Sequence, residues 1–122
     1  MIAREKGSVS ILAAGVMVAL SVLCLGASDV ARVLSAAARA QTAADAAALA
    51  AAQEIALPGG SAPNDVAASY AARNGGELVS CDCDPGAPAA VVEVRVAVGR
   101  LLLFGTDRVV TARAKAVVDR PS

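Results

Sequence analysis

The stretch that decides the fold is residues 29–57, DVARVLSAAARAQTAADAAALAAAQEIAL. Fourteen of these 29 residues are alanine, which has the highest helix propensity of all residues. No glycine or proline interrupts the stretch, and Pro58-Gly59-Gly60 follows it directly. Because glycine and proline end helices, the sequence predicts one alanine-rich helix that stops at residue 57.

The two sides of this predicted helix differ when successive residues are placed about 100° apart. The polar side carries Arg32 and Arg39 among hydroxyl and amide side chains. The large apolar residues gather on another side: Val30, Val33, Leu34 and Ile55. Alanine on the remaining surface lets a second backbone approach closely. We expect the helix to pack against the rest of the chain or against other copies, and a solvated spacer helix is the alternative.

An uncharged stretch of 22 residues, Gly7 to Ser28, precedes the alanine-rich helix. As a helix it spans about 33 Å, and the hydrocarbon core of a bilayer is about 30 Å thick. We therefore expect a transmembrane helix at residues 8–28 that continues without a break into residues 29–57. The preceding tail, residues 1–7, is expected in the cytoplasm because its basic residues cluster tightly before the span.

Other interpretations of the apolar stretch are less consistent with the sequence. A buried globular helix needs a surrounding core, and the rest of this chain is too small to supply one. A removable signal peptide typically has an apolar core of about 7–15 residues, shorter than this one, and the sites near Ser28 are poor cleavage sites. A lipoprotein site at Cys24 normally requires a small residue where the chain has Leu23.

Residues 58–122 are expected to form a small extracytoplasmic α+β domain. Asn64 is a candidate cap for a short helix. Alternating apolar and polar residues predict half-buried strands, which together form a small antiparallel sheet with one apolar face. We expect the alanine-rich helix to cover that face. The predicted elements are a helix at 65–73 and strands at 77–83, 92–98 and 110–118.

Four large apolar residues, Leu101 to Phe104, stand between the last two predicted strands. They cannot all point inward from one strand, since successive side chains alternate between its faces. A short buried turn or helix is one interpretation. The other is an apolar patch that docks on a partner or on the bilayer surface.

The composition excludes several classes of function. Histidine is absent, which removes the commonest general base and metal ligand. Eleven basic residues balance eleven acidic ones, so the footprint of a nucleic-acid-binding protein is missing. No phosphate-binding or nucleophile motif occurs, and the carboxylates are scattered. We expect no enzyme, cofactor, metal, nucleic acid or small-molecule substrate.

Cys81 and Cys83 are the two cysteines outside the span. In an extended strand they lie about 6–7 Å apart on one face, too far for an unstrained bond. They could pair after a local bend, pair with another copy, or stay free. The acidic neighbours Asp82 and Asp84 disfavour a reactive thiolate, so a redox or metal site is the weaker interpretation.

Residues 38–52, ARAQTAADAAALAAA, follow a basic tail, a Gly-Ser junction and an apolar span. This order resembles the N-terminal region of the TadE/TadG-like Flp pilus-assembly proteins over roughly residues 4–55. Gln41 and Asp45 stand at fixed places of that pattern, and the Ala/Arg-rich composition is similar to short actinobacterial members. The resemblance implies a pseudopilin-like or minor-pilin-like structural or assembly component of a tight-adherence (Flp type IV) pilus or a related secretion system.

The resemblance also implies partners and contact residues. The partners would be the lipid bilayer and other pilin-like or pilus- or secretion-assembly membrane proteins. The residues expected to mediate helix packing are Val30, Val33, Leu34, Gln41, Ala44, Asp45 and Ala48. Processing is expected between Gly7 and Ser8, although Leu12 stands where main-type pilins carry glutamate, so the chain could stay uncleaved. A stand-alone membrane-anchored envelope binding module, or a thiol exchanger, are the alternatives to a pilus component.

Overall fold

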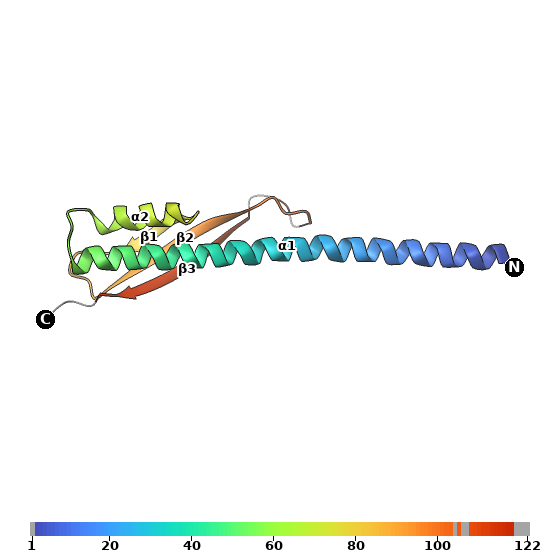
Figure 1. The fold of residues 1–122 in the computed structure, drawn as a ribbon, viewed down its shortest axis with the longest axis horizontal. Helices are drawn as coiled ribbons and strands as arrows, with labels where there is room; N and C mark the ends of the chain where they lie inside the picture. The colour runs from blue at the N-terminus through green and yellow to red at the C-terminus, as the bar shows by residue number, and fades with distance from the viewer. Residues whose placement is uncertain (1, 104, 106–107, 119–122) are drawn as a thin grey trace.

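The computed structural model describes residues 2–103, 105 and 108–118. The chain forms one very long helix, a short helix and a three-stranded antiparallel sheet (Figure 1). The elements in chain order are α1 (Ile2–Ala56), α2 (Pro63–Arg73), β1 (Glu77–Asp82), β2 (Ala89–Gly99) and β3 (Arg108–Val117). The predicted α+β class, with one long N-terminal apolar helix, is therefore confirmed.

Helix α1 runs for 55 residues without a break, so it is about 80 Å long. It ends one residue before the predicted position, at Ala56. The Glu54 carboxylate accepts hydrogen bonds from the backbone amides of Gly59, at 2.7 Å, and Ser61, at 3.2 Å. Gly60 between them has a φ of 93°, which favours glycine. Side-chain capping and a left-handed residue thus turn the chain back towards α2.

Helix α2 begins earlier than the sequence indicates. The capping position is Ala62 rather than Asn64, and the helix makes no side-chain capping hydrogen bond. Pro63 occupies the first turn of α2, where its fixed φ suits a helix. The N–H that proline lacks would have no partner within the helix at this position. The prediction of an Asn64 cap is wrong because this proline provides the start signal two residues before Asp65.

The sheet has the order β1-β2-β3. The alternation predicted for the second strand is confirmed, since Val92, Val94 and Val96 are buried. Strands β2 and β3 pair over most of their length, from Ala89 opposite Val117 to Gly99 opposite Arg108. This long pairing extends β2 at both ends and starts β3 two residues before the predicted position, whereas β3 ends one residue earlier than predicted, at Val117.

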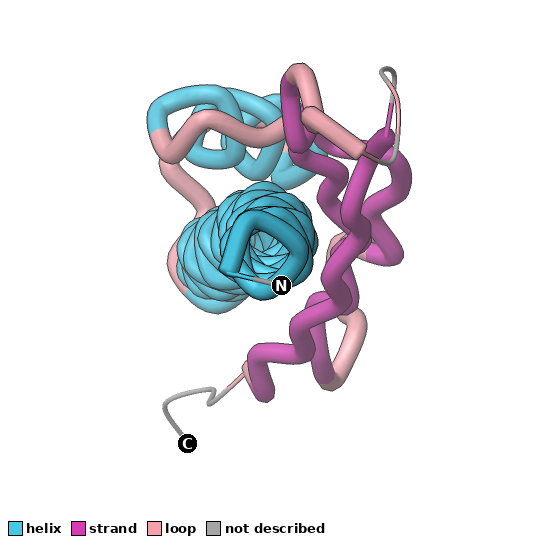
Figure 2. Tube along the Cα trace, turned by 90° about the vertical axis from the view of Figure 1, so that its right-hand side faces the viewer, coloured by secondary structure: helices cyan, strands magenta, loops and turns pink. Residues whose placement is uncertain are grey.

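The core lies where α1 crosses the sheet and α2 packs beside both (Figure 2). Its helical side consists mainly of alanine, so the helices and the sheet come close together. The fully buried alanines are Ala40, Ala43, Ala44, Ala47, Ala51, Ala67 and Ala71 on the helices and Ala90 on β2. At Gly76 an added Cβ would lie 2.5 Å from Val94 Cγ1, so this approach requires glycine.

Candidate functional site

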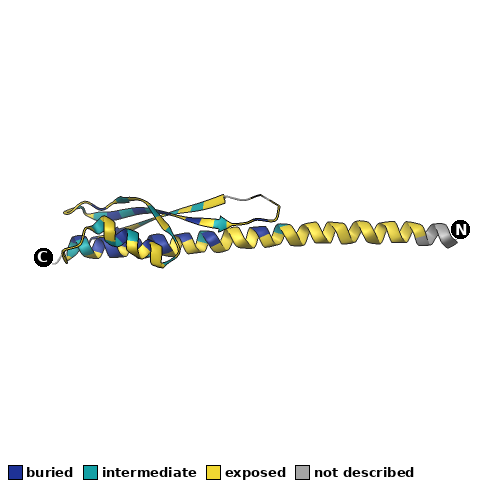
Figure 3. Cartoon of the chain, turned by 90° about the horizontal axis from the view of Figure 1, so that it is seen from above, coloured by how far each residue is buried: buried dark blue, intermediate teal, exposed yellow. Residues whose placement is uncertain are grey.

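Residues 7–25 of α1 are left uncovered by the other described residues. Every residue from Gly7 to Leu25 is exposed (Figure 3). They include ten large apolar side chains: Val9, Ile11, Leu12, Val16, Met17, Val18, Leu20, Val22, Leu23 and Leu25. Among the described residues, α1 is the one helix long and apolar enough to cross a membrane. Gly7 and Ser8, the expected processing junction, are exposed within the helix.

Gln41 and Asp45 join α1 to the edge strand of the sheet. The Gln41 side-chain amide donates to the Asp45 carboxylate at 3.0 Å and to the Arg113 backbone oxygen at 3.4 Å. Residues four apart lie on the same helix face, so the spacing in the motif places both groups beside β3. The structure thus gives these two residues a contact within the chain itself.

Ala44 and Ala48 have 0% and 1% of their surface exposed. Both belong to the core beneath the sheet and α2. Close approach on the alanine face, which the sequence predicts, is therefore made to the chain's own domain. Because these two side chains are already covered, a second copy has no access to them.

The large apolar residues of the expected packing face are divided between two surroundings. Val30 and Leu34 remain 53% and 65% exposed. Val33 is 37% exposed and borders a groove between α1 and the β2–β3 hairpin, together with Val98, Leu101, Arg108, Val109 and Val110. Val30 and Leu34 are consequently the most exposed members of this set.

Asp29 is a feature that the sequence interpretation missed. Its carboxylate is fully buried and accepts hydrogen bonds from the backbone amides of Leu102, at 2.7 Å, and Leu103, at 2.6 Å. One turn further along α1, the Arg32 guanidinium donates to the backbone oxygen of Arg100. The sequence signal for this contact is the position of Asp29, an acidic residue directly after the uncharged stretch and three residues before Arg32.

The β2–β3 loop, which Asp29 and Arg32 hold against α1, places the residues of the predicted apolar patch in different surroundings. Leu101 is buried, with its amide donating to the Gly105 oxygen at 3.1 Å, whereas Leu102 and Leu103 are 53% and 46% exposed. Phe104 lies outside the described residues. The buried-turn interpretation therefore holds for Leu101 alone, and Leu102 and Leu103 are the part of the patch that stays exposed.

Cys81 and Cys83 are joined by a disulfide. Their Cα atoms are 5.3 Å apart, closer than an extended strand would place them. Strand β1 ends at Asp82, between the two cysteines, so the chain is not extended over both of them. The 6–7 Å separation expected for an extended strand therefore does not apply, and the disulfide can form. Cys24 is a free thiol on the exposed half of α1.

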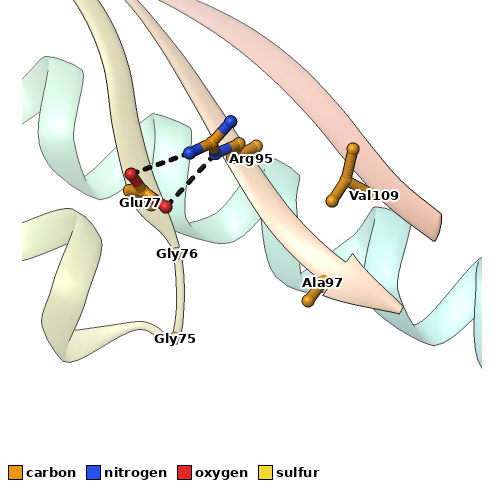
Figure 4. A pocket seen from close by; sticks show the side chains of 6 residues that line it. All are labelled: Gly75, Gly76, Glu77, Arg95, Ala97 and Val109. Atoms are coloured by element: carbon orange, nitrogen blue, oxygen red, sulfur yellow. Dashed lines mark hydrogen bonds and ion pairs between the residues drawn. The ribbon is translucent and has the colours of Figure 1, made fainter. Parts of the chain in front are cut away.

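A shallow hollow on the outer face of the sheet contains one ion pair (Figure 4). Arg95 Nη2 lies 2.9 Å from Glu77 Oε1, and the hydrogen bond and charge of Arg95 lower the pKa of the Glu77 carboxyl. The rest of the lining is small or apolar: Gly75, Gly76, Ala97 and Val109. Among the described residues, no group of three His, Cys, Asp or Glu side chains is placed to hold a metal ion. The hollow thus offers a structural ion pair and no nucleophile or base beside it.

The similarity to known proteins lies entirely within the long helix α1. Residues 7–54 match the model of the Tad family, described as Flp pilus-assembly TadE/G-like. No curated protein and no solved structure matches the chain. The matched region combines the exposed apolar half of α1 with the alanine-rich half, including Gln41 and Asp45, so the predicted resemblance is confirmed. Residues 7–54 are therefore similar to the TadE/G-like Flp pilus-assembly family, and they lie on a helix long and apolar enough to cross a membrane.

Proposed function

We propose that this protein is a membrane-anchored, pseudopilin-like or minor-pilin-like component of a tight-adherence pilus or a related secretion system. The observation that carries the proposal is the division of α1 into an uncovered apolar half and a half buried under the sheet. The uncovered half requires an apolar surrounding, because so much exposed apolar surface is unfavourable in water. Lipid supplies that surrounding in the membrane, and neighbouring helices would supply it in an assembly.

The proposed role is structural and uses no catalytic residue or cofactor. The N-terminus lies in the cytoplasm, and residues 58–122 lie outside it. The disulfide between Cys81 and Cys83 supports this orientation, because disulfides persist in oxidising compartments. Labelling a Ser61→Cys variant on intact cells with a membrane-impermeant maleimide tests the orientation. Labelling only after the cells are opened would contradict it.

The contact surface proposed for other pilin-like helices is centred on Val30 and Leu34. Both are large, apolar and exposed just beyond the span. Cross-linking tests this in a Cys24→Ala background, with Leu34→Cys as the probe and exposed Gln53→Cys as the control. We expect adducts from Leu34→Cys alone, in cells that carry the other pilus genes.

If neither cysteine gives an adduct, the assembly role is contradicted and a stand-alone envelope binding module becomes the better explanation. The mature N-terminus, measured by mass spectrometry, then separates two forms of the assembly role. A start at Ser8 indicates prepilin-type processing despite Leu12, and a filament subunit. A start at Met1 indicates an anchored assembly factor.

A further inference from the structure

The β2–β3 loop lies against α1 at the junction between its uncovered and covered halves (Figure 1). Two contacts with α1 hold the loop there, through Asp29 and Arg32. Hydrogen bonds from backbone amides to a buried carboxylate are strong and directional, so the position of residues 102 and 103 along the helix is well defined. The loop therefore has a fixed height relative to the span.

Leu103 reaches beyond Asp29 towards the N-terminus. Its Cδ1 lies 3.8 Å from the point where a Cβ on Gly26 would stand. Gly26 belongs to the uncharged stretch that ends at Ser28, and it lies about 4.5 Å before Asp29 along the helix axis. The loop thus overlaps the end of the span by nearly one helical turn.

The two exposed leucines of this loop extend the apolar surface of the span. Leu102 and Leu103 remain 53% and 46% exposed, and Leu25 beside Gly26 is 38% exposed. Each of these side chains thus leaves between about a third and a half of its surface uncovered by the described chain. A medium that surrounds Leu25 would also reach Leu103, because both lie at one level of the helix.

We propose that Leu102 and Leu103 insert into the outer edge of the lipid bilayer as a second, shallow membrane contact of the protein. Asp29 acts as the positioning residue that sets the depth of the loop. Its own charge is shielded from the lipid because the loop amides cover it. The domain is thereby attached to the membrane at two points, the span and the hairpin loop, which restricts its rotation about α1.

This inference rests on the proposed membrane anchoring, so the test includes separate probes for each. The chain contains no tryptophan, and a single introduced tryptophan is therefore the only indole fluorophore. The probes are Leu103→Trp and Leu102→Trp in the loop, Leu20→Trp within the span and Leu57→Trp beyond the far end of α1. Each full-length variant is reconstituted in phosphatidylcholine–phosphatidylglycerol vesicles with brominated acyl chains.

For the loop tryptophans we expect quenching at least twice that of Leu57→Trp, strongest with bromine near the headgroup end of the chain. Aqueous acrylamide should quench Leu57→Trp more than either loop variant. Loop tryptophans that behave like Leu57→Trp, while Leu20→Trp is strongly quenched, would overturn the loop contact and leave the anchoring intact. An unquenched Leu20→Trp would overturn the anchoring itself.

Discussion

The two halves of α1 have opposite relations between side-chain size and burial. From residue 7 to residue 28 the helix is rich in leucine, isoleucine and valine, and those side chains are exposed. From residue 29 to residue 56 it is rich in alanine, and most of the alanines are buried. A helix that meets lipid gains from large apolar side chains, whereas a helix that packs closely on protein gains from small ones. One continuous helix can therefore lie in lipid over one half and pack on protein over the other, when its composition changes along its length.

A charge in the exposed half should produce the largest effect. Leu20→Arg places a guanidinium near the middle of the span, where insertion costs about 2.5–3.5 kcal/mol per arginine. Leu49→Arg is the matched control, since Leu49 is 60% exposed on the covered half. We expect alkaline extraction of membranes to release a large part of Leu20→Arg and none of Leu49→Arg. Full retention of both variants would show that lipid does not surround the first half.

Removing the Asp29 carboxylate tests the boundary between the halves. Asp29→Ala deletes two hydrogen bonds to a charged acceptor, and such bonds contribute about 1.5–3 kcal/mol. Amide hydrogen exchange at Leu102 and Leu103 should accelerate by roughly ten- to a hundredfold if one such bond limits opening. Exchange at these amides should stay unchanged in Asp65→Ala, a change at an exposed carboxylate far along the chain. Unaltered exchange in both variants would mean that the carboxylate does not hold the loop.

The same substitution placed in each half compares their packing directly. Ala47→Leu forces three extra carbon atoms into a fully buried position, and overpacking of this kind costs about 1–3 kcal/mol. Ala14→Leu adds the same atoms to an exposed position. Denaturant unfolding in detergent micelles should show a lower midpoint for Ala47→Leu alone. Equal midpoints would contradict the tight packing between α1 and the sheet.

The smallest effect is expected at the Glu77–Arg95 pair, whose side chains are exposed on the sheet and separate from both halves of α1. Arg95 lowers the pKa of Glu77 in the folded chain below the ordinary value of 4.5. The pair's contribution to stability is therefore present above pH 4.5 and is lost as the pH falls through the lower, folded value. An NMR titration of the Glu77 carboxyl in Arg95→Gln should return its pKa towards the ordinary value. An unchanged titration would exclude Arg95 as the cause.

The parts of the fold that were predictable depend on local signals. The alanine-rich composition and the absence of glycine predict residues 29–56 of α1, and the period-two alternation predicts the buried valines of β2. The start of α2 was misplaced because Asn64 and Pro63 are both start signals, and the structure uses the proline. Boundaries are sensitive to such competition between neighbouring residues.

The candidate site was less predictable because its contacts join distant parts of the chain. Asp29 and Leu102 are 73 residues apart, and nothing local indicates their hydrogen bond. The helix periodicity marks Ala44 and Ala48 as a packing surface, but it does not say which molecule covers them. Only the arrangement of the sheet and α2 over α1 shows that the chain covers them itself.

The unbroken path of α1 through the expected membrane boundary has a mechanical consequence. With no glycine or proline hinge between residues 29 and 56, the covered half is a lever arm of about 42 Å fixed to the span. A change of about 10° in the tilt of the span would move the far end of that arm sideways by about 7 Å, and tilts of this size are common for membrane helices. The sheet and α2 would follow as one body, so a small reorientation within the bilayer becomes a large displacement outside it.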